Sequence, residues 1–223
     1  MLAYHFTGPT LRDGQPMPPR GAWLEHDGPL IPCERGLHAS RDPFDALNYA
    51  PGVLLHRVEI DGAFVEHGTP PDKLCAQRRR ILATIDATAL LREFSRWCAL
   101  QAIHLWDAPK IAQDYLITGE ERRRDAAYAA AKTAASTAVA GGRAIVAVDA
   151  AWSTGWAAAD RTTVVCVASR GAAMYAASAV AADVVDAEDI NAWTAALAAA
   201  LAAQREQFRQ LVEAAFSMIE AAG

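Results

Sequence analysis

The sequence lacks the cysteine and histidine spacings that build metal sites and small disulfide frameworks. Its four cysteines lie far apart, at Cys33, Cys75, Cys98 and Cys166, and no CxxC pair occurs among them. No HExxH, HxH or HxxxH spacing occurs either. Because a zinc knuckle or a disulfide-rich scaffold needs closely spaced ligands or paired thiols, both classes are excluded. We therefore predict reduced thiols and no metal site.

The chain also has little excess charge and no long apolar segment. Its formal net charge is −5, spread over both halves, whereas broad capture of nucleic acid needs a basic face. No run approaches the roughly 18 apolar residues of a membrane span. The start, MLAYHFTGPT, lacks the charged region, apolar core and cleavage site of a secretory signal. These absences predict a bacterial cytoplasmic protein that binds neither nucleic acid nor a membrane.

What the sequence does contain changes abruptly along its length. The first part is rich in proline, histidine and turn residues, whereas alanine dominates from residue 125 onward. At 223 residues the chain is long enough for two domains, by the usual prior of about 100 to 200 residues each. We predict an α+β protein. Residues 1–118 form a small mixed or antiparallel sheet with one helix, then two further helices after residue 86, and residues 119–223 form an all-α alanine-rich domain.

Short stretches of alternating polarity predict the strands of the first domain. In Ala3–Thr7, tyrosine and phenylalanine alternate with histidine and threonine, as in a half-buried strand. Val53–Asp61 repeats this pattern, and its end, Asp61-Gly62, is a dipeptide typical of a tight turn. A third strand is predicted over Lys73–Ile85.

One helix is predicted between these strands, with clear signals at both ends. Asp42 can accept hydrogen bonds from free backbone N–H groups as the N-cap, and Pro43 suits the first helical position. Asp45 complements the N-terminal dipole. The helix extends to Tyr49 and is stopped by Pro51-Gly52.

The second half is predicted to be helical throughout. Alanine favours helix because it loses almost no side-chain entropy there, and small side chains let helix axes approach closely. The alanine-rich segments fit a repeat array or ordinary helical hairpins equally well. Arg161–Ser169 has a strand-like composition, but we predict helix there from its surroundings. Apolar residues recur at helical spacing from Trp193 to Ile219, a stripe typical of a core or an oligomer seam, and we predict a homo-oligomer.

Two groups of side chains in the N-terminal part are suited to a ligand. Imidazole is a common general base, although hydrogen-bonded histidines on strand faces give the same pattern. On a strand, Arg78 and Arg80 project from one face and Arg79 from the other, so the pair could hold a phosphate or carboxylate. The alternative is a solvated edge strand whose charge prevents further pairing. Five of the six histidines fall in this part: His5, His26, His38, His56 and His67.

Gly36–Ala50, GLHASRDPFDALNYA, is the most specific stretch of the chain. With YHFTGPTLRDG and WLEHDGPL before it, and VEIDGAFVEH, DKLCAQRRRILATID and IHLWDAP after it, it resembles an uncharacterised family spread through phage and prophage genomes. Related forms read GFHAC in place of GLHAS. The resemblance covers about the first 118 residues and implies that the front domain is the shared unit, with the tail as an adaptor or assembly element. The resemblance to this family implies no particular reaction.

A fainter similarity is to ADP-ribosyltransferase-like enzymes. The order YHFT, GLHAS, a helix with a tyrosine, and then VLLHRVEI is similar to their split-sheet core. The resemblance implies that His5 contacts the ribose of NAD, that Tyr49 stacks on nicotinamide, and that Ser40 lies in the middle motif. Glu59 would be the catalytic glutamate, although no ExE motif surrounds it.

Three hypotheses for function follow. The first is a phage-encoded accessory protein that binds a small anionic, nucleotide-like ligand or a host defence protein without catalysis and without a cofactor, and so counters host defence. Its predicted binding residues are His5, Ser40, Tyr49, Arg78 and Arg80. The second is an NAD-using, ADP-ribosyltransferase-like enzyme. The third is a structural or assembly protein with no ligand.

Overall fold

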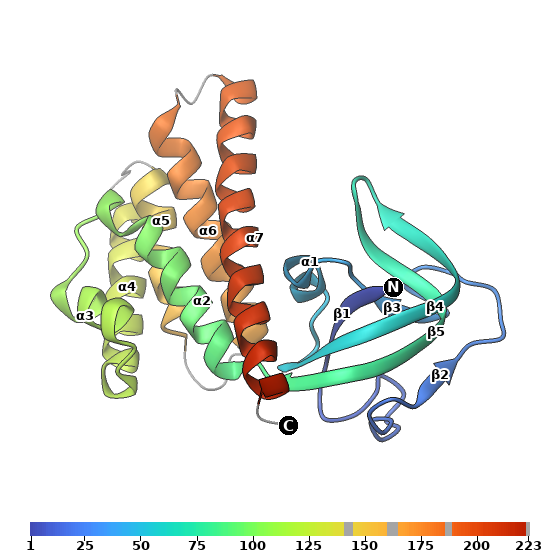
Figure 1. The fold of residues 1–223 in the computed structure, drawn as a ribbon. Helices are drawn as coiled ribbons and strands as arrows, with labels where there is room; N and C mark the ends of the chain where they lie inside the picture. The colour runs from blue at the N-terminus through green and yellow to red at the C-terminus, as the bar shows by residue number, and fades with distance from the viewer. Residues whose placement is uncertain (141–144, 160–164, 186–188, 222–223) are drawn as a thin grey trace. The chain divides into compact units, whose positions relative to one another are not determined.

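The computed structural model describes residues 1–140, 145–159, 165–185 and 189–221, and it divides into two compact units. The first unit contains Met1–Thr88 and the C-terminal residues from Phe208, and the second contains Ala89–Gln207. The named strands lie in the first unit and most helices in the second (Figure 1), which confirms the predicted α+β class. This division does not coincide with the predicted boundary after residue 118, because residues 89–118 group with the helical unit.

The sheet of the first unit has five antiparallel strands. Their order is β1-β4-β5-β2, and β3 also pairs with β5. All three strands predicted from alternation are present, and the third extends one or two residues beyond its predicted limits at each end. The strands are β1 (Leu2–Thr7), β2 (Trp23–Glu25), β3 (Leu37–Ala39), β4 (Leu54–Gly68) and β5 (Pro71–Asp86).

A backbone bridge between β1 and the end of β3 closes four strands into a circuit. The N–H of Tyr4 donates to the carbonyl of Ser40 at 2.8 Å, and the N–H of Ser40 donates back at 2.9 Å. Since β1 pairs with β4, β4 with β5 and β5 with β3, this bridge completes the ring. Both faces of β1 are therefore largely covered, and Thr7 is 4 % exposed. The expectation of a half-buried strand with a polar outer face was wrong here.

The predicted turn at Asp61-Gly62 was also wrong. β4 continues through it to Gly68, and the hairpin turns at Thr69-Pro70 instead. Gly62 has a φ of +74° and lies where the register of β4 against β5 shifts. A glycine with positive φ serves a β-bulge as well as a turn, so the dipeptide alone did not distinguish the two.

Helix α1 (Pro43–Asn48) was predicted well. The Asp42 carboxylate accepts a hydrogen bond from the N–H of Phe44 at 2.8 Å, and Pro43 occupies the first turn. Tyr49 is the C-cap, with its N–H bonded to the carbonyl of Ala46. This position places the tyrosine ring at the end of the helix, beside β5, where it contributes to the site described below.

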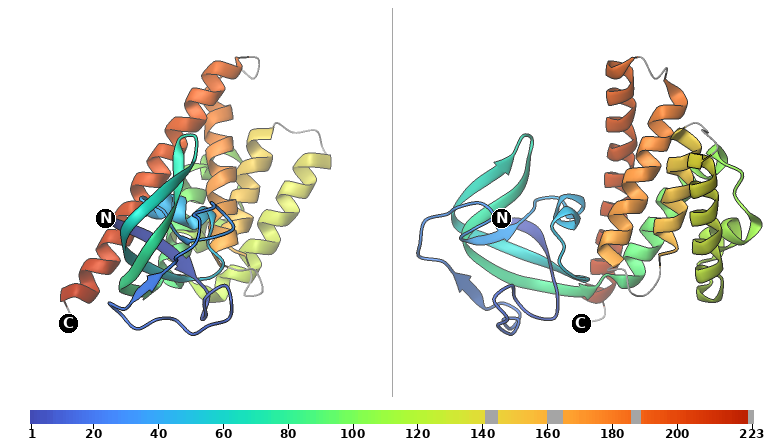
Figure 2. Two further views of the ribbon diagram at one scale, coloured as in Figure 1. Left: turned by 90° about the vertical axis from the view of Figure 1, so that its right-hand side faces the viewer. Right: turned by 180° about the vertical axis from the view of Figure 1, so that it is seen from behind.

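The second unit contains tightly packed helices, with α4, α5 and α6 side by side (Figure 2). Buried alanines line these contacts, and the Ser153 hydroxyl donates across them to the carbonyl of Ala172 at 2.8 Å. The helical prediction holds for the part of Arg161–Ser169 within α6; residues 161–164 lie outside the described ranges. The helices are α2 (Thr88–Gln101), η1 (Ile103–Leu105), α3 (Lys110–Thr118), α4 (Glu121–Ala140), α5 (Ile145–Ala157), α6 (Val165–Val184) and α7 (Ile190–Ala221).

Helix α6 corrects the expectation about apolar segments. Among the described residues, it alone is long and apolar enough to cross a membrane by length and composition. However, 56 % of its most apolar window is buried inside the protein. Such burial is typical of a core helix in a soluble protein.

Candidate functional site

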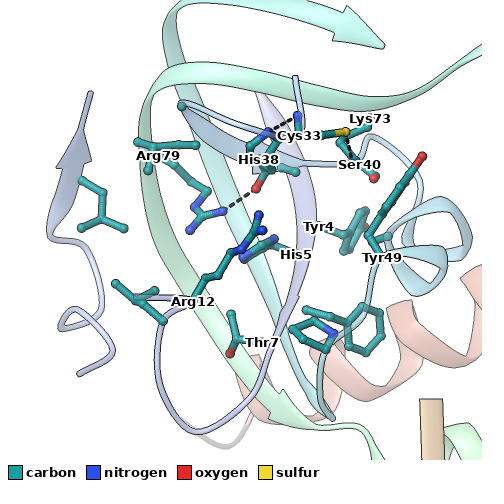
Figure 3. Close-up of a pocket in the computed structure, with 18 of the residues that line it drawn as sticks. Tyr4, His5, Thr7, Arg12, Cys33, His38, Ser40, Tyr49, Lys73 and Arg79 are labelled. Carbon is teal, nitrogen blue, oxygen red and sulfur yellow. Dashed lines mark hydrogen bonds between the residues drawn. The ribbon is translucent and has the colours of Figure 1, made fainter. Parts of the chain in front are cut away.

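A cavity of about 1170 Å³ lies within the first unit (Figure 3). Its walls come from β1 and the loop after it, β2, β3 and the loop before it, α1 and its C-terminal end, and β5. Its lining includes seven ionisable residues described below: His5, Arg12, Cys33, His38, Tyr49, Lys73 and Arg79.

Arg79, from β5, is a buried cation on the wall of this cavity. Its side chain is 5 % exposed, and its Nη1 donates to the backbone carbonyl of His38. Its Nε has no hydrogen-bond partner, and no carboxylate pairs with it in the described ranges. Burial lowers the pKa of Arg79 to about 10. The guanidinium is thus a desolvated charge with unused donor capacity.

His38, from β3, lies beside this arginine and is neutral. The backbone N–H of Cys33 donates to its Nε2 at 3.0 Å, so the single proton of the neutral ring resides on Nδ1. Burial, followed in order by the positive charges of Lys73, Arg79 and Arg12, lowers the pKa of His38 to about 4. Three cations from two parts of the chain therefore act on this imidazole.

Lys73 forms the opposite part of the cationic wall. It is 9 % exposed, its Nζ donates to the Cys33 sulfur at 3.3 Å, and the same nitrogen lies 3.5 Å from the centroid of the Tyr49 ring. The Tyr49 hydroxyl donates to Asp72 Oδ2 at 2.6 Å. Burial and this hydrogen bond raise the pKa of Tyr49 to about 12, so the phenol stays protonated. One face of the ring contacts the ammonium, and the side chain is 43 % exposed.

Two further imidazoles lie close together near the cavity: His5 lines it, and His56 does not. The Thr7 hydroxyl donates to the Gly8 carbonyl, so His56 Nε2–H is the donor in its 2.8 Å bond with Thr7, and His56 Nδ1 accepts from Thr84 at 2.8 Å. Burial and then the charge of Arg79 lower the pKa of His56 to about 4. His5 stacks on His56 with ring centroids 6.4 Å apart, and burial lowers its pKa well below the ordinary value.

The structure brings together only part of the predicted binding set. His5, Ser40 and Tyr49 line the cavity, but Arg78 and Arg80 do not. Both arginines lie over the ring of Trp23, with their guanidinium carbons 4.5 and 4.7 Å from its centroid. Because side chains alternate along a strand, the residue between them faces the cavity instead.

Ion pairs account for the two excluded arginines and for the predicted catalytic glutamate. Arg78 pairs with Asp61 at 2.7 Å and with Glu25 at 3.1 Å. Arg80 pairs with Glu59 at 2.5 Å. Glu59 is not part of the cavity lining. The cations of the cavity that the sequence analysis missed are Arg79, Lys73 and Arg12. No sequence signal distinguished their place in the cavity lining from the positions of other basic residues.

The described residues contain no group of three or more histidine, cysteine or acidic side chains placed to hold a metal ion. The polar groups that face the cavity near His38 are instead hydrogen-bond donors on cationic side chains. Such a wall is suited to an anion and not to a metal cation.

Residues 1–93 match the model of a family described as a domain of unknown function (DUF7666). No curated protein and no solved structure matches the chain. The match covers all five strands, α1 and the beginning of α2, so the entire cavity lining lies within it. The N-terminal part of the chain is therefore similar to a domain family of unknown function, and the cavity lies within the matched residues.

Proposed function

We propose that the N-terminal domain binds a small anionic, nucleotide-like ligand in this cavity without converting it chemically. One observation carries the proposal: Arg79 is 5 % exposed and lines the cavity, yet it has no carboxylate partner among the described residues and an unused Nε–H. A buried charge without a partner is costly, and proteins normally pair it. A ligand anion in the cavity supplies that partner.

The other lining groups support the same ligand chemistry. Lys73 is almost as buried as Arg79, and within the described ranges its ammonium contacts a thiol sulfur and an aromatic ring and forms no ion pair. Arg12 is exposed and forms no ion pair within the described ranges. The two lining carboxylates, Asp13 and Glu34, are solvent-exposed and leave the buried wall positively charged.

The dimensions and apolar lining support a nucleotide-like body. A cavity of about 1170 Å³ is slightly larger than common ligand sites, which measure about 300 to 1000 Å³, so it has room for a nucleotide-sized body. Phe6, Leu11 and Pro51 contribute apolar surface, and the partly exposed Tyr49 ring offers a stacking surface. Tyr4 is a poorer platform, because it is 6 % exposed and its hydroxyl is bonded to Glu213.

The biological setting that we propose comes from the resemblance of Gly36–Ala50 and its flanking segments to phage and prophage proteins. In that setting the protein is a phage accessory protein in the cytoplasm of an infected bacterium. Sequestering a small anionic ligand, or occupying a host defence protein, would counter host defence. Self-association through the helical unit stays a prediction from the apolar stripe of α7.

Thermal unfolding with a nucleotide panel tests the binding proposal. A ligand at about one hundred times its dissociation constant adds about 2.7 kcal/mol to the unfolding free energy, which gives a clear rise in melting temperature. We expect Arg79→Met to abolish this rise. The matched control is Arg78→Met, which changes the neighbouring arginine on the opposite face and should retain it. If no nucleotide or other phosphate compound shifts the wild-type protein, the small-ligand proposal is wrong.

The ADP-ribosyltransferase-like alternative retains one supporting observation, since His5 and Tyr49 line the same cavity. It needs a catalytic glutamate beside them, and Glu59, the residue predicted for that role, is instead bonded to Arg80 outside the lining. The test is incubation with NAD followed by product analysis. NAD consumption that His5→Ala removes would support this alternative, and intact NAD under varied acceptors would count against it.

A further inference from the structure

We infer that the cavity holds the terminal phosphate of a phosphate monoester, bound as a dianion beside His38 by Arg79, Lys73 and Arg12. This inference rests on the proposed anionic-ligand site and specifies its chemical class. It distinguishes a nucleoside monophosphate, which ends in a doubly ionisable phosphate, from diesters such as cyclic nucleotides, whose phosphate carries a single charge.

Hydrogen bonds link Arg79 and Lys73 to His38, directly for Arg79 and through Cys33 for Lys73. Arg79 Nη1 donates to the His38 carbonyl. Lys73 Nζ contacts the Cys33 sulfur at 3.3 Å, and the backbone N–H of Cys33 donates to His38 Nε2 at 3.0 Å. Figure 3 shows this chain of hydrogen bonds, with Arg12 entering the cavity from the opposite side. After burial, the charges of these same three cations lower the pKa of His38.

The donors outnumber the acceptors in this part of the cavity. Arg79 offers its unpartnered Nε–H, Lys73 and Arg12 offer only donors, and neutral His38 carries its proton on Nδ1. Such a set of donors favours the fully ionised form of a phosphate, because the described lining of this cavity contains no buried carboxylate that could accept a phosphate proton. A singly charged diester leaves at least two of the three cations without compensation, whereas a dianion compensates two.

The inference also predicts a pH dependence. A phosphate monoester loses its second proton at about pH 6, so its affinity should rise as the pH increases through that value. His38 and His56, with pKa values of about 4, stay neutral in this range, as does His5 with its lower pKa. The remaining ionisable groups on the lining come from β1, β5, the end of α1 and the two loops: Tyr4, Lys73, Arg79, Tyr49, Arg12, Asp13, Cys33 and Glu34.

Calorimetric titration of the full chain with matched nucleotides tests the inference. The probes are the 5′-monophosphates of adenosine, guanosine, cytidine and uridine, each compared with its 3′,5′-cyclic monophosphate, which keeps the base and sugar but has a diester. We expect at least one 5′-monophosphate to bind about tenfold or more tightly than its cyclic counterpart at about pH 7.5. This preference should diminish at about pH 5, where the monoester becomes a monoanion.

The outcomes separate this inference from the proposed function. Cyclic and open nucleotides that bind equally, or cyclic ones that bind more tightly, overturn the monoester inference and leave the anionic site standing. If no nucleotide binds, and neither inorganic phosphate nor phenyl phosphate binds, both the monoester inference and the proposed anionic-ligand site are wrong. Arg79→Met should remove the preference for the monoester, while Arg78→Met should keep it; loss of the preference in both variants also contradicts the assignment to Arg79.

Discussion

Arg79→Met should stabilise the ligand-free protein while abolishing ligand binding. The substitution replaces a buried guanidinium, 5 % exposed, by an apolar side chain that fills similar space. Most substitutions of buried residues destabilise a protein by about 0.5 to 3 kcal/mol. An increase in stability here would therefore be a distinctive result, and it follows from the absence of a carboxylate partner among the described residues.

The magnitude follows from the pKa of the arginine. Burial lowers this pKa to about 10, which corresponds to a penalty of about 3 kcal/mol for keeping the charge in the folded protein at neutral pH. Methionine removes that penalty. It also removes the hydrogen bond to the His38 carbonyl, and the loss of a hydrogen bond from a charged donor destabilises the folded protein by about 1.5 to 3 kcal/mol. Burial of additional apolar surface shifts the balance toward stability, so we expect a net gain of about 1 to 2 kcal/mol.

Urea unfolding of ligand-free protein measures this change. The midpoint should rise at an unchanged slope, because the surface exposed on unfolding is nearly the same. Arg78→Met is again the matched control: Arg78 is 38 % exposed in its side chain and ion-paired with Asp61 and Glu25. We expect that control to change the unfolding free energy by less than about 1 kcal/mol.

A loss of more than about 1 kcal/mol in Arg79→Met would refute the reasoning. It would mean that the guanidinium is compensated within the protein, and the argument for a ligand anion would lose its basis. A gain in stability accompanied by full retention of ligand binding would also refute it, because Arg79 would then be dispensable for the site.

Three further predictions concern other parts of the chain. Gly171→Ala should destabilise the protein by about 1 to 3 kcal/mol in urea unfolding, because the new Cβ would lie 2.5 Å from the Trp156 ring. The control Gly155→Ala, whose nearest contact is 3.9 Å away, should be neutral or stabilise the protein by up to about 1 kcal/mol. Equal changes in unfolding free energy in the two variants would contradict this explanation. Burial lowers the folded-state pKa of His56 to about 4, so the unfolded state binds more protons between about pH 6.5 and 4. His56 should therefore reduce the unfolding free energy by about 3 kcal/mol on acidification through this range. If His56→Gln loses stability with falling pH in the same way as the wild type does, this origin is wrong. Iodoacetamide should alkylate Cys33 first in the folded protein, because it is the exposed cysteine, and mass spectrometry that finds a buried cysteine modified at the same rate would disprove that order.

The sequence determined the local structure closely where short-range chemistry decides it. Asp42 and Pro43 specified the start of α1 because an N-cap acceptor and a preset φ act within one turn. The strand predicted over Lys73–Ile85 is present as β5, and the alternation of side chains along a strand placed Arg79 on the face opposite Arg78 and Arg80. His5, Ser40 and Tyr49, selected from the signature and its flanking strand, do line one cavity.

Tertiary structure alone decided which of the two strand faces became the site. The Tyr4–Ser40 bridge closes the strands into a ring and buries Arg79 at its wall, whereas Trp23 and nearby carboxylates occupy Arg78 and Arg80 on the other face. Successive side chains of a strand point to opposite faces because of the backbone geometry, so the sequence alone shows that neighbouring arginines point apart. Which of them lies in an enclosed cavity depends on strand pairings between residues far apart in the chain, and no local pattern records those pairings.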